Sequence, residues 1–219
     1  MAKRLGWYFP EQLVLKITLA QSEPAIWRRV EVHSGLTLDD LHYVIQYVFD
    51  WTNSHLYQFF VPPGGKLTQK AMREARCYQG APEPMFGADE DIRPADEEMV
   101  GRVFTPQCKQ IVYEYDFGDS WNHIVKLEKR TPGGDQDHVP QCLAGENAAP
   151  LDDTGGIYGY YEFLEALLDP EHERHEDAVE WLGKDFDPTR FDLDKINRRL
   201  AAAFKPMPKR PRKPRKKGE

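Results

Sequence analysis

The chain has 219 residues, 40% of them hydrophobic and 12% aromatic, and a formal net charge of −7. This content supports one sizeable core or two small units and argues against disorder through the body of the chain. No apolar run is long enough for a transmembrane helix, and no apolar stretch of a signal peptide precedes Pro10. The three cysteines, Cys77, Cys108 and Cys142, lie far apart, which favours free thiols and a cytoplasmic location.

The first half of the chain predicts a β-β-α-β unit. Residues 1–12 form a leader segment, and Leu13–Ala20 and Ala25–Val32 alternate as two strands of a hairpin. Thr37–Phe49 has the apolar stripe of an amphipathic helix, and His55–Val61 returns as a strand. The helix should therefore pack on one face of the sheet.

Two local signals in this unit make sharper predictions. Thr37 is a good N-cap, and Asp40 stands at the third helical position, as in a capping box. Arg28 and Arg29 point to opposite faces of a regular strand. The arginine that faces the core then needs an acidic or carbonyl partner, because a buried charge without one is costly.

The region from Pro62 to Ala95 is rich in Pro, Gly and acidic residues, and we expect it to be a long irregular loop. Such loops are usually functional or mobile, and the sequence leaves this choice open. Asp96–Phe104 is expected to form a short helix. No regular element is predicted within 138–150, which contains Cys142.

The centre of the chain predicts a β-hairpin. Ile111, Tyr113, Tyr115 and Phe117 alternate with polar residues, Gly118-Asp119 supplies a two-residue loop, and Trp121–Lys129 forms the second strand. This register places Asp116 opposite Trp121 and Glu114 opposite His123. The side chains of Glu114, Asp116 and His123 would then share one face. A three-residue loop would break that register.

Three helices are predicted after the hairpin. Tyr158–Leu168 has helical apolar spacing, His175–Leu182 is closed by Gly183, and Asp192 caps a last helix that contains Leu193, Ile196 and Leu200. The predicted fold is α+β: one domain, residues 13–204, with a mixed or antiparallel sheet, the central hairpin and C-terminal helices, followed by a disordered basic tail, residues 205–219.

The tail reverses the charge of the body. It has eight basic residues and one acidic residue, a net of +7, against −14 for the rest of the chain. Clustered Lys and Arg attract phosphate backbones without reading sequence. The candidate nucleic-acid-binding residues are Lys205, Lys209, Arg210, Arg212, Lys213, Arg215, Lys216 and Lys217. The alternatives are a solubility or targeting segment, or a tail that folds back on the acidic body.

Several stretches together resemble the plasmid Ri-type ORF-three-like family, whose members are labelled transposon-passenger or resolvase-like. These are Pro24–Arg29, Thr37–His42, Trp51–Leu56, Tyr115–His123, Pro140–Cys142, Asp153–Gly156 and Phe186–Asn197. The resemblance spans most of Leu13–Leu200 and implies little about mechanism. No serine stands in a Tyr-x-Arg-x-Ser setting, so we discount recombinase chemistry.

The candidate catalytic cluster is Asp116, Asp119 and His123, with Glu114 nearby. Carboxylates beside an imidazole bind divalent metals or divide acid and base roles. The structural alternative, which we favour, is that Asp119 forms the turn, Asp116 holds hairpin backbone or pairs with Arg28 or Arg29, and His123 is a core-edge residue.

Other metal-ligand candidates are scattered singly. His42, His55 and Cys142 join Asp116 and His123 as weak candidates, and only the fold could bring them together. His172 and His175 lie in a densely charged stretch that a solvated helix start explains. The Asp153–Gly156 turn precedes a helix and could bind an anion, but a sharp turn with a cap is the simpler explanation.

The sequence therefore predicts a plasmid- or mobile-element-associated module that binds nucleic acid or a protein partner. We expect no cofactor under this hypothesis. The alternative is a metal-dependent hydrolase or nuclease centred on Asp116, Asp119 and His123, which would require a divalent metal.

Overall fold

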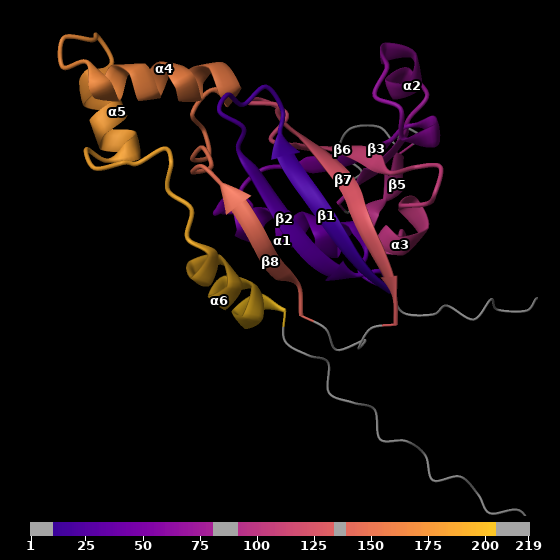
Figure 1. Ribbon diagram of the computed structural model, residues 1–219. Coiled ribbons are helices and arrows are strands. Elements are labelled where there is room, and N and C mark those ends of the chain that lie inside the picture. Colours follow the sequence, from indigo (N-terminus) through magenta and orange to yellow (C-terminus); the bar gives the residue numbers. More distant parts are fainter. Residues whose placement is uncertain (1–10, 81–91, 134–138, 205–219) are drawn as a thin grey trace, which may run out of the picture.

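The computed structural model describes residues 11–80, 92–133 and 139–204, and within them an eight-stranded mixed sheet is the central element (Figure 1). The strand order is β5-β4-β3-β6-β7-β1-β2-β8. All neighbours are antiparallel except β4 and β5, which are parallel. The strands are β1 (Glu11–Leu19), β2 (Trp27–His33), β3 (Tyr57–Val61), β4 (Arg76–Gln79), β5 (Ile92–Pro94), β6 (Gln110–Tyr115), β7 (Trp121–Pro132) and β8 (Gln141–Glu146).

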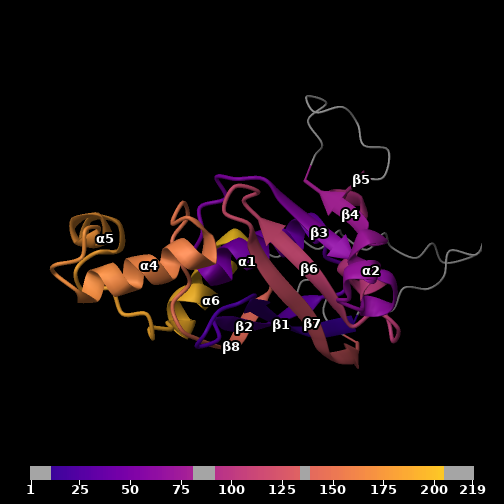
Figure 2. The ribbon, with the colours of Figure 1, turned by 90° about the horizontal axis from the view of Figure 1, so that it is seen from above.

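Six α-helices accompany the sheet in the described part of the chain. They are α1 (Leu38–Phe49), α2 (Gln69–Arg73), α3 (Val100–Val103), α4 (Gly156–Leu168), α5 (His175–Leu182) and α6 (Leu193–Ala203), with 3₁₀ turns at Pro63–Gly65 and Ala95–Glu97. Helix α6 packs on β8 and α1. Helices α4 and α5 project from the side of the molecule opposite β4 and β5 (Figures 1 and 2).

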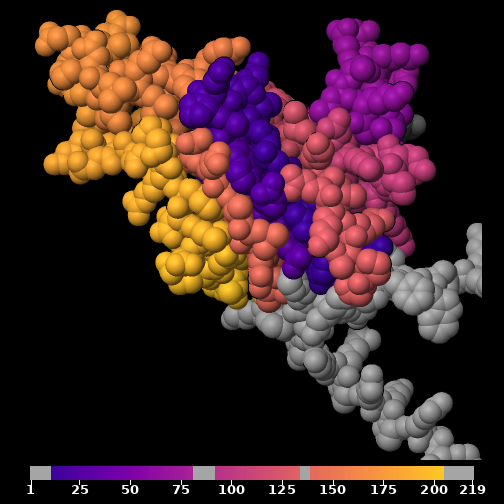
Figure 3. Space-filling view, in the orientation of Figure 1, coloured from indigo at the N-terminus to yellow at the C-terminus, as the bar shows by residue number. Residues whose placement is uncertain are grey.

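The core lies between α1 and one face of the sheet. Alternate residues of β1 are fully buried, and the apolar stripe of α1 faces them. The other face of β1 and β7 lies at the molecular surface (Figure 3). Half-buried polar residues, such as the Arg29–Glu128 ion pair at 2.6 Å, occupy it. The sheet thus has one dry and one solvated face, as antiparallel sheets commonly do.

The predicted α+β fold and its β-β-α-β start are confirmed. The capping box is present: the Asp40 N–H donates to Thr37 Oγ1 at 3.0 Å, and the Thr37 N–H donates to Asp40 Oδ2 at 2.9 Å. Arg28 and Arg29 do face opposite sides. Arg28 is the buried one, and its partners are carbonyl oxygens.

Two stretches without predicted structure contain regular elements. Residues 141–146 form strand β8, whose weak alternation is overridden by pairing with β2. The region expected to be an irregular loop, Pro62–Ala95, contains α2, β4 and β5, because β4 adds to the edge of β3. Residues 81–91 of that region, most of the 1–12 leader and the whole 205–219 tail lie outside the described residues.

Candidate metal centre

The central hairpin forms, but its register differs from the prediction by one residue. Tyr115 pairs with Trp121, Glu114 with Asn122, and Tyr113 with His123. The loop has five residues because Asp116 and Ser120 both take positive φ, 57° and 52°, and the Ser120 N–H donates to Asp116 O at 2.6 Å. A one-residue shift moves side chains to the other face. The prediction that Glu114 and His123 share a face was therefore wrong.

His123 is a core residue in this register. Its side chain is fully buried, with edge-to-face contacts to Phe49 and Trp51, and Nδ1 lies 3.0 Å from the carbonyl oxygen of Trp121. Burial lowers the pKa of His123 to about 3, so the imidazole is neutral at physiological pH. Glu114 lies on the other face, where its carboxylate accepts a hydrogen bond from Gln58 at 2.6 Å.

A different histidine meets Asp116. His55, just before β3, places Nε2 3.7 Å from Asp116 Oδ2 and 3.0 Å from Asp153 Oδ1. The three potential ligand atoms all lie within 4.8 Å of one another. Nε2 is buried and has no hydrogen-bond partner among the described residues, because neither carboxylate meets it with hydrogen-bond geometry. Two acidic oxygens thus surround the nitrogen at ion-pair distance, and neither accepts a hydrogen bond from it.

The hairpin loop fixes the orientation of Asp116. One carboxylate oxygen, Oδ1, accepts a hydrogen bond from the Gly118 N–H at 2.9 Å, while the backbone N–H of Asp116 donates to Leu56 O at 2.9 Å. The second oxygen, Oδ2, is left to face His55. This arrangement resembles the ligand orientation that outer hydrogen bonds impose in metal sites.

Asp153 reaches the cluster because its loop is docked on the hairpin. Asp119 Oδ2 accepts a hydrogen bond from the Gly155 N–H at 3.0 Å. Gly156 has φ +69°, and a Cβ there would lie 2.5 Å from the carbonyl oxygen of Asp119. The close approach therefore requires glycine. Nearby, Thr52 Oγ1 donates to Asp152 at 2.6 Å.

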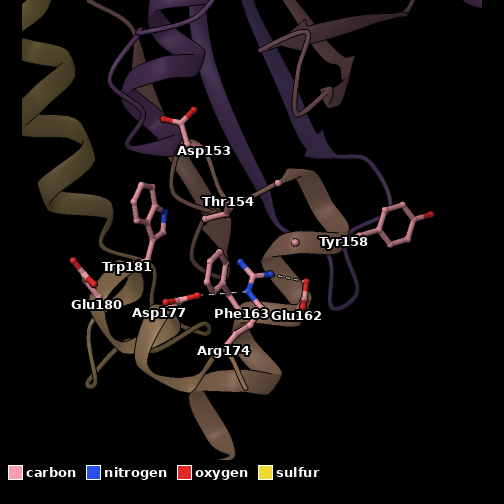
Figure 4. Close-up of a pocket in the computed structure, with 11 residues that line it drawn as sticks. Asp153, Thr154, Tyr158, Glu162, Phe163, Arg174, Asp177, Glu180 and Trp181 are labelled. Atoms are coloured by element: carbon pink, nitrogen blue, oxygen red, sulfur yellow. Dashed lines mark hydrogen bonds and ion pairs between the residues drawn. The ribbon is translucent and has the colours of Figure 1, made fainter. Parts of the chain in front are cut away.

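A cavity of about 690 Å³ adjoins the cluster (Figure 4). Asp153, Thr154 and Gly155 lie at one end, and α4 and α5 form the walls. Arg174 stands over the ring of Phe163 at 4.3 Å and pairs with Glu162 at 2.7 Å and Asp177 at 4.0 Å. The remaining lining residues are Tyr158, Gly159, Glu180 and Trp181. Asp153 thus belongs to both the cluster and the cavity wall.

The other predicted ligands have separate partners. His42 is buried, with Nδ1 2.7 Å from Tyr113 Oη and Nε2 2.7 Å from Asn53 Oδ1, and burial lowers its pKa to about 4. Cys142 is a buried free thiol whose pKa burial raises to about 11. His172 Nδ1 accepts from the Arg174 N–H at 3.1 Å, and His175 Nδ1 lies 2.8 Å from Ala166 O.

The residues that come together are thus Asp116 and His55 from the predicted candidates and Asp153, which the sequence indicated only as part of a turn. One imidazole and two carboxylates suit divalent ions such as Zn²⁺ and Mn²⁺. Three protein ligands also leave coordination positions for water or substrate, which is the pattern of catalytic rather than structural sites.

The sequence of this α+β chain matches a known family. The family model of the plasmid pRiA4b ORF-3-like proteins matches residues 11–195, and the chain belongs to that family. It is 37% identical over 185 residues to the uncharacterized protein y4hQ of Sinorhizobium fredii, covering 84% of this chain and 88% of that protein.

A solved structure extends the comparison to the fold. The crystal structure of MM3350 from Methanosarcina mazei, a protein of unknown function, matches with a TM-score of 0.71 and 37% identity. The match covers 85% of this chain and 97% of that one. Across the described ranges, no helix has the length and apolar character needed to cross a membrane.

Proposed function

We propose that this protein binds one divalent metal ion through His55, Asp116 and Asp153 and uses it for hydrolysis. The observation that carries the proposal is the buried Nε2 of His55, which faces two carboxylate oxygens without a hydrogen bond. A buried polar nitrogen that makes no hydrogen bond is costly. A cation among the three ligand atoms would remove that cost and offset the repulsion between the two carboxylates.

The two carboxylate ligands differ in their exposure to solvent. Asp116 is buried and held by the hairpin loop, whereas the Asp153 side chain is 57% exposed. In such a site Asp116 would hold the metal in a fixed position, and the side near Asp153 would be open to solvent. A metal held there would lower the pKa of a bound water and so supply a nucleophile at neutral pH.

The neighbouring cavity is where we place the substrate. Its wall has the aromatic rings of Phe163 and Trp181 and more acidic than basic groups. A polyanionic backbone would be repelled by Glu162, Asp177 and Glu180, since only Arg174 opposes them. The lining therefore favours a small-molecule or peptide hydrolase over a nuclease.

Calorimetric titration of tag-free, chelator-treated protein with Zn²⁺, Mn²⁺ and Mg²⁺ tests the proposal. We expect one site per chain, with affinity at least about 10-fold weaker in Asp116→Asn and His55→Gln. Asn tolerates the positive φ of residue 116 and keeps the amide oxygen for Gly118. His172→Gln is the matched control and should bind as the wild type does. Absence of binding, or equal binding by all variants, would contradict the proposal.

Catalysis has its own test. Metal-loaded wild type is assayed with a p-nitrophenyl ester and a p-nitrophenyl phosphodiester, and Asp153→Asn is assayed beside it. We expect hydrolysis of the ester, reduced at least about 10-fold in the variant. If the metal binds but neither compound is hydrolysed faster than by the free ion, the protein is a metal-binding protein and the proposed hydrolysis is contradicted.

A second candidate is binding of nucleic acid or a protein partner through residues 205–219. The support is the charge of that segment, eight basic residues against one acidic residue. None of Cys77, Cys108 and Cys142, which are all described, forms a disulfide, and this supports a reducing, cytoplasmic setting for it. Deletion of 205–219 should abolish binding to DNA and RNA at low salt. Unchanged binding, or none by the full chain, would remove this candidate.

A further inference from the structure

Arg28, on β2, is a buried cation near the C-terminal end of α1. It is 3% exposed, and its hydrogen bonds run from Nε to Val48 O at 2.9 Å and from Nη1 to Trp27 O and Glu146 O, both at 2.8 Å. All three acceptors are carbonyl oxygens, and the bonds use Nε and Nη1 but not Nη2. No ion pair joins Arg28 to a carboxylate within residues 11–80, 92–133 and 139–204.

The guanidinium is charged in this setting. Burial lowers the pKa of Arg28 to about 10, which still leaves it protonated at neutral pH. A buried charge is normally compensated by an opposite charge, because desolvation is costly. Carbonyl dipoles provide part of that compensation here, and no acidic side chain of the described chain provides the rest.

Aromatic rings and a glycine shape the space around the guanidinium. Its central carbon lies 5.1 Å from the ring centre of Phe49 and 5.0 Å from that of Phe191. A Cβ on Gly145 would lie 2.6 Å from the Phe191 ring and 2.9 Å from Cδ of Arg28. Glycine at 145 therefore lets the arginine and the ring occupy these positions together.

Arg28 lines a pocket of about 510 Å³, separate from the cavity beside Asp153. The pocket lies among the end of α1, residues 148–151 and the segment that connects α5 to α6. Its apolar wall consists of Val48, Phe49, Ala148, Ala149, Pro150, Leu151, Leu182, Phe186, Phe191 and Ile196. This volume suits a small organic molecule, and the wall suits an apolar body.

Other charged side chains also line the pocket, three basic and four acidic. Lys184, Arg190 and Lys195 accompany Asp50, Asp185, Asp187 and Asp192 in the lining. Most of these acids are engaged: Asp50 pairs with Lys195 at 2.6 Å and with Arg199, Asp187 accepts from Thr189, and Asp192 caps α6. Arg28 differs from these residues because it is buried and bonded only to carbonyl oxygens among the described residues.

We propose that this pocket is a binding site for a small organic carboxylate with an aromatic or aliphatic body. The carboxylate would accept hydrogen bonds from the guanidinium of Arg28, and the body would pack on Phe191 and the apolar wall. Nη2 carries the two N–H groups that the carbonyl bonds do not use. Charge-assisted bonds from arginine to carboxylate are among the strong ones. The site is independent of the proposed metal centre.

Titration of the full chain with phenylacetate, in the presence of a chelator, tests this site by ligand-detected NMR. Phenylacetamide is the neutral probe of the same shape, and inorganic phosphate tests whether an anion alone is sufficient. We expect phenylacetate to bind at least about 10-fold more tightly than phenylacetamide, and phosphate to bind weakly.

Variants locate the binding. Arg28→Met should lose the preference for phenylacetate, whereas Arg29→Gln, the neighbouring arginine on the solvated face, should keep it. If Arg28→Met does not fold, Leu182→Trp, which enlarges a side chain of the apolar wall and leaves Arg28 in place, should abolish binding. Equal binding of the two probes, binding of neither, or unchanged binding in Leu182→Trp would overturn the proposal.

Discussion

Two histidines, one on β7 and one just before β3, have opposite surroundings. His123, on β7, lies in the dry core among the rings of Phe49, Trp51 and Tyr113. His55, just before β3, lies where two loops meet and faces Asp116 and Asp153. The imidazole is the same, yet only the second has anionic neighbours. A histidine's chemistry is decided by what surrounds it, and here the loops rather than the sheet bring the acids.

The buried core histidines, His42 and His123, predict a large loss of stability in acid. The unfolded chain protonates its histidines below about pH 6.5, whereas burial holds the pKa of His42 at about 4 and that of His123 at about 3. Each native imidazole therefore binds fewer protons than its unfolded form. Stability should fall as pH drops below about 6.5, by about 2 kcal/mol for each imidazole at pH 5.

Urea unfolding at pH 7 and pH 5 measures this loss. His123→Phe, which removes one of the two groups, should show about half of the histidine contribution. A wild type that keeps its full stability at pH 5, or a variant with the same pH dependence as the wild type, would mean that the core does not hold these imidazoles neutral.

The docked loops predict the next largest effect. Gly156→Ala must relieve both a positive φ and a Cβ 2.5 Å from Asp119 O, so we expect a loss of about 2–3 kcal/mol. Gly133→Ala is the matched control, because its φ is also positive, +79°, and nothing lies within 4 Å of its Cβ. It should lose only about 1 kcal/mol. Equal losses by thermal denaturation would show that the loops are not in close contact.

Mutations at the N-terminal ends of α1 and α4 should differ in their effect on metal affinity. Helix α1 begins with the Thr37 capping box. Helix α4 follows its N-cap residue Gly155, whose N–H donates to Asp119. Thr37→Ala should cost about 1 kcal/mol and leave metal affinity unchanged. Asp119→Ala should weaken metal binding, because it releases the loop that holds Asp153. Calorimetry of both variants checks this, and unchanged affinity in Asp119→Ala would contradict it.

The smallest effect is expected on the solvated face of the sheet. Glu128 and Arg29 form a partly exposed ion pair at 2.6 Å, and such pairs contribute about 0.2–1 kcal/mol. Glu128→Gln should therefore change the free energy of unfolding by less than about 1 kcal/mol, and salt should reduce the difference. A larger loss would mean that this face is less solvated than its exposure indicates.

The elements that could be predicted from the sequence are those fixed by hydrophobic periodicity and helix-capping residues. The strands before and after α1, the start of α1 at Thr37 and the last three helices follow from local patterns, and each is present. Strand β8 was missed because six residues with little alternation become a strand only through pairing with β2. The hairpin register was missed because the positive φ of Asp116 and Ser120, which lengthens the loop, leaves no mark in the alternation.

The candidate metal centre was predictable only in part. Asp116 and His55 were among the candidates, but the one-residue register error joined Asp116 to His123 instead of His55. Asp153 stands 37 residues after Asp116, and no local spacing links the two. Their meeting depends on the contact between Asp119 and Gly155, which is a tertiary interaction. The Asp-Thr-Gly-Gly turn was the available signal, and it was assigned to capping.

The most direct test of the account is anomalous diffraction from crystals of the protein soaked in Mn²⁺ or Zn²⁺. We predict one strong peak within coordination distance, about 2.0–2.2 Å, of His55 Nε2 and of oxygens of Asp116 and Asp153. The same crystals of Asp116→Asn should show a weaker peak or none. A peak elsewhere, or no peak while Nε2 of His55 donates a hydrogen bond to Asp153, would contradict the account and make the cluster a structural contact between loops.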